Sequence, residues 1–273
     1  HPPLHGWGSV SPAAVRIDSS NGGPVLHDVR IADSSTQGLY ATASLPIVED
    51  CVFERNQNDA VYMGSATLVR NNIWRDNNRD GGRVTVINGG EFTGNLIRGN
   101  GSDGLELDTG SQVSVRDNDF IDNGSRGLEM RSAPLEFVGN RILHNGSGME
   151  LRFYRDALFV EGNVFAYNNS HGLSVRSDSC CGEGAPEPVE YNTFIGNRGG
   201  LGFNSEAGAI IRYNLFQGKT QPQAAVRLNL NGSPQEDMVF SYNAFVGNQV
   251  EPWFDVGAPS GSPFVDVTDN YWN

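Results

Sequence analysis

A short asparagine-led motif returns at a nearly constant spacing through the middle of the chain. It begins at Asn95, Asn118, Asn140 and Asn163, with intervals of 23, 22 and 23 residues. Each unit has an apolar residue two positions after the leading asparagine, a second asparagine five positions after it, and then an apolar-x-apolar triplet. A period of this length is the signature of a solenoid, in which each structural unit stacks on the next.

The same register extends in both directions along the chain. The leading position of the other units is held by Val29, Cys51, Asn72, Asn192, Asn214, Asn243 and Asn270. Two positions later, all the units share one apolar column: Ile31, Phe53, Trp74, Ile97, Phe120, Ile142, Phe165, Phe194, Phe216, Phe245 and Trp272. A column this regular predicts that the side chains share one buried face.

Short alternating runs within each unit predict β-strands with one buried face. Examples are Leu-Glu-Leu at 105–107 and Leu-Glu-Met at 128–130. Glycine and asparagine separate the runs and allow bends at positive φ. No stretch keeps a 3.6-residue period, which disfavours a leucine-rich horseshoe with helices. One coil therefore fits three short strands and three turns, stacked about 4.8 Å from the next coil.

This pattern resembles the right-handed parallel β-helix repeat proteins over about residues 25–273. The resemblance predicts an all-β chain that forms a single right-handed parallel β-helix of about eleven coils of 21–23 residues, with longer loops in the C-terminal coils. We expect residues 1–24 to be a leading partial coil or linker, and the whole chain to be a fragment of a larger protein. The fold leaves the function open, because lyases, hydrolases, epimerases, phage spikes and adhesins share it.

The charge of the chain narrows the range of partners. The formal net charge is −13 and the pI is about 4.7, so the chain has no basic stripe with which to bind nucleic acid. A surface rich in carboxylates is compatible with Ca²⁺ or a basic partner, or simply with solubility. No apolar run approaches the length of about 18 residues that a membrane span needs.

The cysteines do not form a disulfide framework. Cys51 takes an interior leading position, about five coils from Cys180 and Cys181. That separation is roughly 24 Å, far beyond the ~7 Å between Cα atoms that a disulfide allows, so Cys51 should be free. Cys180 and Cys181 could pair with each other or with a partner outside this chain.

The two asparagine columns predict side chains that hydrogen-bond from coil to coil at the turns. Four residues of the second column lie in Asn-x-Ser glycosylation sequons: Asn100, Asn123, Asn145 and Asn168. Glycans on adjacent coils would emerge only about 5 Å apart, so we expect most of these sequons to be unused. Asn231, in a predicted inserted loop, is the better glycosylation acceptor.

Three glutamates, Glu106, Glu129 and Glu150, stack on consecutive coils and are predicted to face solvent. Like charges about 5 Å apart could raise a pKa, as a general acid requires. Two positions further along lie Asp108, Arg131 and Arg152, close enough to compensate them. The column therefore reads either as a solvated charge lattice or as a patch that faces a carbohydrate or binds Ca²⁺.

The sequence contains few of the catalytic motifs that are typical of the known enzyme families of this fold. Only Ser170-His171-Gly172 is similar to the Gly-His-Gly group of polygalacturonases, and the Asp-Pro-His-Asp motif of mannuronan epimerases is missing. Alginate lyases use a Lys–Arg pair, whereas Lys219 is the only lysine of this chain. If the chain is an enzyme, its candidate catalytic residues are Glu106, Glu129, Glu150, Arg152, Tyr154 and His171.

Three insertions, at 178–188, 229–237 and 255–263, follow the final strand of their coils. Insertions at one point of a repeat collect on one edge of the solenoid, and that edge is often the binding edge. The candidate binding residues there are Asp178, Glu183, Glu187, Glu236, Asp237 and Trp253.

Two classes of function follow. The first is a non-catalytic extracellular scaffold that recognises a protein or a glycan. Gly6-Trp7-Gly8 and Asn270-Tyr271-Trp272 resemble segments of bark beetle (Anakonda), a large insect adhesion protein of junctions where three epithelial cells meet. That resemblance, rather than any spacing, implies adhesion and an extracellular location. The second class is a polysaccharide lyase or epimerase that acts on a uronic-acid polymer.

Overall fold

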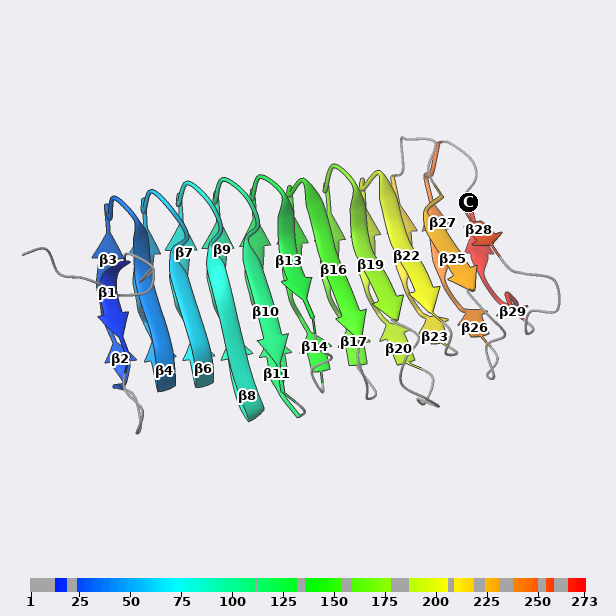
Figure 1. Ribbon diagram of the computed structural model, residues 1–273. Helices are drawn as coiled ribbons and strands as arrows, with labels where there is room; N and C mark the ends of the chain where they lie inside the picture. Colours follow the sequence, from blue (N-terminus) through cyan, green and yellow to red (C-terminus); the bar gives the residue numbers. More distant parts are fainter. Residues whose placement is uncertain are drawn as a thin grey trace, which may run out of the picture.

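The computed structural model describes residues 13–18, 24–110, 112–131, 136–153, 159–177, 187–205, 209–218, 224–230, 238–249, 254–257 and 265–273. Every regular element in these ranges is a β-strand, and the strands form a right-handed parallel β-helix whose coils follow one another along a single rod (Figure 1). The predicted fold is confirmed. In the described part of the chain, no helix is long and apolar enough to cross a bilayer.

The first face of the rod carries the longest strands, and each pairs in parallel with its counterpart one coil away. Its strands are β1 (Ala13–Ile17), β4 (Gln37–Glu49), β6 (Val61–Arg70), β8 (Gly82–Thr93), β10 (Leu105–Thr109), β13 (Arg126–Met130), β16 (Ser147–Phe153), β19 (His171–Ser177), β22 (Gly199–Ser205), β25 (Val226–Leu230) and β28 (Phe254–Gly257). Strand β1 falls within the predicted leading segment and pairs with β4.

The second face is continuous with the first, because β4, β6 and β8 bend through the corner between them and join both faces into one 19-stranded sheet. Its other strands are β2 (Leu26–His27), β11 (Ser114–Arg116), β14 (Glu136–Val138), β17 (Phe159–Glu161), β20 (Glu187–Glu190), β23 (Ala209–Arg212), β26 (Met238–Ser241) and β29 (Val265–Asp266).

The third face is a separate 11-stranded sheet with one short strand from each coil. Its strands are β3 (Arg30–Ala32), β5 (Val52–Glu54), β7 (Ile73–Arg75), β9 (Leu96–Arg98), β12 (Asp119–Ile121), β15 (Arg141–Leu143), β18 (Val164–Ala166), β21 (Thr193–Ile195), β24 (Leu215–Gln217), β27 (Ala244–Val246) and β30 (Tyr271–Trp272).

The predicted apolar column forms the core behind the third face. From Phe53 to Phe245 its members are at most 2% exposed, and Phe120 pairs in register with Ile97 and Ile142. Trp272, in the last coil, stacks on Phe245 with ring centroids 4.3 Å apart but remains 43% exposed. The interior is therefore a continuous apolar rod, which each coil lines from all three faces.

The asparagine columns form two buried hydrogen-bond ladders, as predicted. At Asn118 the side-chain oxygen accepts from the backbone and side-chain nitrogens of Asn95, at 2.9 and 3.0 Å. Its Nδ2 donates to the Phe92 carbonyl and to Asn140 Oδ1, both at 2.9 Å. One ladder runs from Asn72 to Asn270 and the other from Asn56 to Asn197, so each buried turn has its polar groups satisfied.

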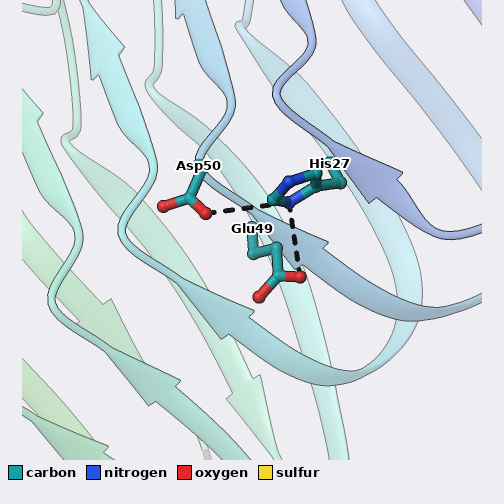
Figure 2. Close-up of side chains that lie close together, drawn as sticks. All are labelled: His27, Glu49 and Asp50. Carbon is teal, nitrogen blue, oxygen red and sulfur yellow. Dashed lines mark ion pairs between the residues drawn. The ribbon is translucent and has the colours of Figure 1, made fainter.

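The residue before each ladder position, whether or not that position holds asparagine, turns the chain through the left-handed region. These residues have φ between 53° and 68°, which glycine, asparagine and aspartate tolerate best. At the first corner, between the second and third faces, they are Asp28, Asp50, Asn71, Gly94, Asp117, Gly139, Gly162, Tyr191, Tyr213, Tyr242 and Asp269. At the second corner, between the third and first faces, they are Asp33, Arg55, Asp76, Gly99, Asp122, His144, Tyr167, Gly196, Gly218 and Gly247. Figure 2 shows Asp50, one of the first-corner residues, with Glu49 and His27 beside it.

The structure tests the predictions made for Cys51 and for the sequon asparagines. Cys51 is buried and free, as predicted, and its backbone N–H donates to Asn72 Oδ1 at 3.0 Å. The four sequon asparagines of the second ladder are at most 2% exposed, because their side chains point into the ladder. Asn231, Cys180 and Cys181 lie outside the described residues.

Candidate functional site

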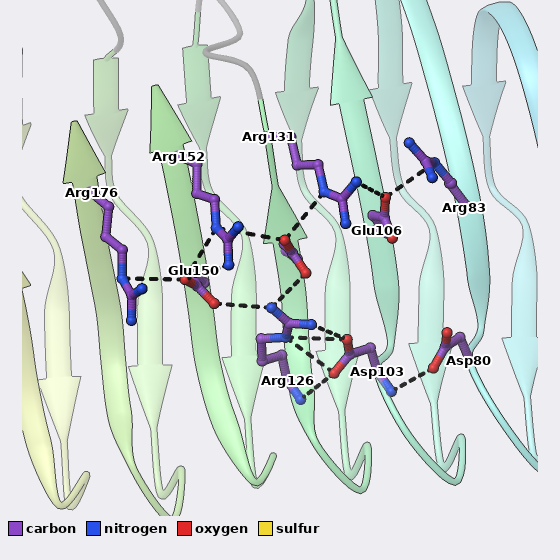
Figure 3. A network of polar contacts seen from close by, with 10 residues as sticks. Asp80, Arg83, Asp103, Glu106, Arg126, Arg131, Glu150, Arg152 and Arg176 are labelled. Atoms are coloured by element: carbon purple, nitrogen blue, oxygen red, sulfur yellow. Dashed lines mark hydrogen bonds and ion pairs between the residues drawn. The ribbon is translucent and has the colours of Figure 1, made fainter. Parts of the chain in front are cut away.

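The three candidate glutamates form one outward column of the first face, as predicted. Glu106 of β10 pairs in register with Glu129 of β13, and Glu129 with Glu150 of β16. Figure 3 shows the arginines that fill the spaces between these carboxylates on consecutive coils. The column is the centre of a network of ion pairs, which we call the charged face.

The prediction that these glutamates face solvent is wrong for Glu129, which is only 2% exposed. Arg126 Nη1 lies 2.5 Å from Glu129 Oε2, and Arg131 Nε lies 3.3 Å from Oε1. Arg152 Nε, from the next coil, lies 3.7 Å from Oε1. These three guanidinium groups cover the carboxylate, so it is buried on the outer surface of the sheet.

Glu106 and Glu150 have opposite pKa shifts. Burial raises the pKa of Glu106, and the charges of Arg83 and Arg131, at 3.1 and 2.9 Å from Oε1, offset this only in part. Burial also acts to raise the pKa of Glu150, but a hydrogen bond from Arg126 and the charges of Arg152 and Arg176 outweigh it and lower the pKa. The arginine contacts therefore shift the pKa values of these two carboxyls, which lie two coils apart in the same column, in opposite directions.

Arg126 connects three coils of the charged face. Its guanidinium contacts Asp103 at 2.6 Å, Glu129 at 2.5 Å and Glu150 at 3.0 Å (Figure 3). Burial would lower the pKa of Arg126, but the bond to Asp103 and the negative charges around it raise the pKa overall. Because each glutamate of the column is held by at least two arginines, a Ca²⁺ ion would have to displace ion pairs already formed.

His171, one of the candidate catalytic residues, begins β19 and is half-buried. Burial lowers its pKa, and the positive charges of Arg227, Arg176 and Arg198 lower it further. The imidazole is therefore neutral at neutral pH. Ser170 Oγ lies 3.3 Å from its Nδ1. Within the described ion pairs, His171 is not joined to the network around Glu129.

The structure describes only part of the predicted loop edge. The strands that flank the three insertions, namely β19 with β20, β25 with β26 and β28 with β29, place all three between the first and second faces. The insertions thus do not follow the final strand of a coil, because a short second-face strand comes after each of them. Glu187 belongs to β20, and Tyr154, Asp178, Glu183, Glu236, Asp237 and Trp253 lie outside the described residues.

Sequence reasoning missed a row of tyrosines at the first corner. Tyr191, Tyr213 and Tyr242 follow one another on consecutive coils and are 41–54% exposed. Their rings stack nearly parallel, with centroids 5.0 and 5.3 Å apart. We call these three residues the tyrosine corner. The signal was present in the sequence, since each tyrosine directly precedes a ladder asparagine.

An arginine packs against the tyrosine corner, and a glycine precedes it on the neighbouring coil. The Arg212 guanidinium carbon lies 5.5 Å from the centre of the Tyr213 ring, and its Nε contacts Glu190 at 2.6 Å. On the coil before Tyr191 the corner residue is Gly162, and a Cβ built there would meet no heavy atom within 4 Å. Gly162 thus has no side chain to cover the outer face of the Tyr191 ring.

A comparable but shorter stack lies at the second corner. His144 and Tyr167 stack with centroids 5.1 Å apart, and the Tyr167 ring lies over Gly196, where a Cβ would approach it within 2.8 Å. The Tyr167 ring therefore has a neighbour on each side, His144 and Gly196, although the residue is 53% exposed, much as Tyr191 is. This stack offers a natural comparison for the tyrosine corner, because its aromatic residues also occupy the left-handed region.

Comparison with protein families agrees with the fold. The family described as "right handed beta helix region" matches residues 13–160, more than half of the 273-residue chain. The chain belongs to the right-handed β-helix family. Comparisons with curated proteins and with solved structures gave no match.

Membership of the right-handed β-helix family supports a scaffold that enzymes and non-enzymes can both use. The matched residues run from β1 into β17, so both the tyrosine corner and His171 lie beyond them. Any function must therefore be argued from the side chains of the individual coils.

Proposed function

We propose that this chain is a non-catalytic extracellular scaffold that recognises a glycan through the tyrosine corner. The observation that carries this proposal is the placement of three exposed tyrosines in the left-handed region. Earlier coils fill the same corner with aspartate, asparagine or glycine, which adopt this conformation at lower cost.

The conformation of these tyrosines carries an energetic cost. A bulky residue in the left-handed region costs roughly 1–2 kcal/mol. An aromatic pair gains about 0.5–1.5 kcal/mol beyond the area it buries, and the described rings form two such pairs, with Arg212 over the Tyr213 ring as well. Residues held in a strained backbone conformation cluster at functional sites, including sites that clamp a ligand.

The chemistry of the corner fits a sugar. The exposed Tyr191 ring, next to which Gly162 carries no side chain, is a flat apolar platform of the kind on which a pyranose ring can stack, since tyrosine combines an apolar ring with a polar tip. Hydroxyl groups at the ring edges, together with the Arg212–Glu190 pair, provide donors and acceptors beside it. The adhesive role and extracellular location implied by the resemblance to bark beetle agree with such a surface.

The test replaces the corner with the residue that the fold itself uses there. In the variant Tyr191→Asn/Tyr213→Asn/Tyr242→Asn, each substitution suits the left-handed backbone, as Asn71 does at the same corner. We expect it to fold like the parent and to lose at least tenfold in affinity on a glycan array. The matched control is His144→Asn/Tyr167→Asn, which removes the stack of the second corner and should bind like the parent.

Equal glycan binding by the corner variant would refute the proposal. Loss of binding to a protein partner, without any glycan binding by the parent, would show that the corner acts but that the ligand class is wrong. The loop edge is a separate proposal: shortening 178–188 and 229–237 should leave glycan binding intact if the tyrosine corner is the main site.

One observation favours an alternative, a lyase or epimerase that acts on a uronic-acid polymer. His171 is neutral and lies in the field of Arg176, Arg198 and Arg227. Arginines can neutralise a uronate carboxylate while a neutral imidazole removes a proton beside it. Turnover of any polymer in a uronic-acid panel that is lost in both His171→Gln and Glu129→Gln would establish this alternative in place of the scaffold.

A further inference from the structure

We propose that His27, Glu49 and Asp50 form a binding site for one divalent transition-metal ion of the zinc type. The three residues come from the first two coils and lie at the first corner, and Figure 2 shows their side chains converging in front of β2 and β4. One ligand atom from each residue lies within 4.8 Å of the others.

The backbone fixes the two sides of this site. His27 of β2 is paired in register with Glu49 of β4, so their side chains project from the same face one coil apart. Asp50 follows Glu49 and turns through φ 55°, which brings its carboxylate round the corner toward His27. The three ligands are therefore held by strand pairing and a ladder turn rather than by a flexible loop.

The distances match a metal of the zinc type. His27 Nδ1 lies 3.3 Å from Glu49 Oε1 and 3.7 Å from Asp50 Oδ2. Ligands at about 2.1 Å around a tetrahedral zinc ion are about 3.4 Å from one another. Small side-chain adjustments would therefore bring the three atoms into coordination. Imidazole with two carboxylates suits zinc and its neighbours, whereas Ca²⁺ and Mg²⁺ prefer sites made only of oxygen.

Arg70 supports the site from the following coil. Its Nε and Nη2 contact Glu49 Oε2 at 2.6 and 2.5 Å, which leaves Oε1 turned toward His27. A partner that holds one carboxylate oxygen orients the other toward the metal. The side chains of His27 and Asp50 are 59% and 47% exposed, so an ion can enter from solvent and keep water in the remaining positions.

Without an ion this cluster contributes little to the fold, because ion pairs this exposed are worth little. With an ion bound, the first two coils would be joined by a link that the strand pairing alone does not provide. The proposal concerns a part of the rod far along the chain from the tyrosine corner, and it does not depend on glycan recognition.

The test is a titration of the full chain with Zn²⁺ by calorimetry at neutral pH, together with thermal melting. We expect one ion bound at the corner and a rise in Tm when Zn²⁺ is present. His27→Gln and Asp50→Asn should each weaken binding at least tenfold and remove the rise in Tm. Asp50→Asn keeps a residue suited to this corner, since Asn71 follows at the equivalent position, and it should therefore fold normally.

Matched control variants distinguish Zn²⁺ binding at this site from Zn²⁺ binding by other histidines. His144→Gln, at the second corner, should bind Zn²⁺ like the parent chain. Visible absorption of added Co²⁺ should show coordination in the parent and lose it in His27→Gln. The proposal is overturned if His27→Gln binds Zn²⁺ as tightly as the parent, if the double variant His1→Gln/His5→Gln abolishes binding, or if Ca²⁺ displaces Zn²⁺ at equal concentration.

Discussion

Replacing one ladder asparagine should destabilise the rod far more than its small size suggests. In Asn118→Ala, the backbone and side-chain nitrogens of Asn95 lose the oxygen to which both donate, at 2.9 and 3.0 Å. The Phe92 carbonyl loses its bond from Nδ2, whereas Asn140 Oδ1 keeps the backbone N–H of residue 118. The backbone N–H of Asn95 thus loses its acceptor, whereas Asn95 Nδ2 keeps its bond to the Val69 carbonyl at 3.0 Å.

The magnitude follows from the cost of leaving buried polar groups unpaired. The unpaired N–H of Asn95 costs about 1–3 kcal/mol and each of the two other lost bonds about 0.5–1.5 kcal/mol, which gives roughly 2–6 kcal/mol for the substitution. This is a large fraction of the 5–15 kcal/mol that typically stabilises a folded domain. Asn118 is fully buried, so little water reaches the site to compensate.

The assay combines urea denaturation followed by circular dichroism with hydrogen exchange. The control is Asn169→Ala, an exposed asparagine next to the second ladder, which should change the free energy of unfolding by no more than about 0.5 kcal/mol. Exchange should accelerate first at the amide of Asn95, which loses its acceptor. If Asn118→Ala is no less stable than the control, the ladder does not stabilise the fold and the reasoning fails.

Three further predictions test other parts of the rod. Phe120→Ala should cost roughly 3–5 kcal/mol by calorimetry, because it opens a cavity between Ile97 and Ile142; an unchanged Tm would contradict the core assignment. Burial acts to raise the pKa of Glu54, but Arg30, Arg75 and Arg55 outweigh it and hold the pKa at about 2. Since this folded-state pKa is below the ordinary value of 4.5, the stabilisation is present above about pH 4.5 and is lost as pH falls toward 2; Glu54→Gln should lack this step in acid unfolding, and an identical acid profile would count against it. In a secretory host, peptide mass spectrometry should find glycan on Asn231 and none on Asn123, and occupancy at Asn123 would mean that its side chain leaves the ladder.

The fold could be predicted from the sequence because the ladder restricts its own residues. At Asn118 the side chain must accept two bonds and donate two, and an amide does this within the space of one turn. The requirement repeats in every coil, so it appears as a period in the sequence. The apolar column repeats for the same reason, since each coil must fill the same volume of the core.

The environment of the charged face could not be predicted in the same way. The alignment of Glu106, Glu129 and Glu150 followed from the period, but the burial of Glu129 depends on where long arginine side chains fold. Arg126 and Arg131 come from its own coil and Arg152 from the next, and each could have extended into solvent instead. Register determines which Cα atoms are neighbours, but it does not determine side-chain conformation.

The cluster of His27, Glu49 and Asp50 is a contact that the register implies but that the asparagine repeat does not mark. His27 and Glu49 each lie two residues before a leading position, so aligning the coils places them side by side. The leading positions there are Val29 and Cys51 rather than asparagine, so the asparagine motif does not mark the two coils that hold this pair. The turn of Asp50 toward His27 also depends on its positive φ, which only the structure reveals.

The tyrosine corner shows how a regular fold can reveal a function through its exceptions. At the first corner the backbone requires a left-handed residue, and Asp50, Asn71 and Gly94 satisfy it at little cost. Tyr191, Tyr213 and Tyr242 satisfy the same requirement at a higher cost and keep about half of each side chain in solvent. A tyrosine needed for packing would be expected among the interior columns, where aromatic residues already fill every coil from Phe165 to Phe245. Because the backbone favours a smaller residue at this corner and the core is filled from other columns, we propose that these tyrosines serve the recognition of an outside molecule.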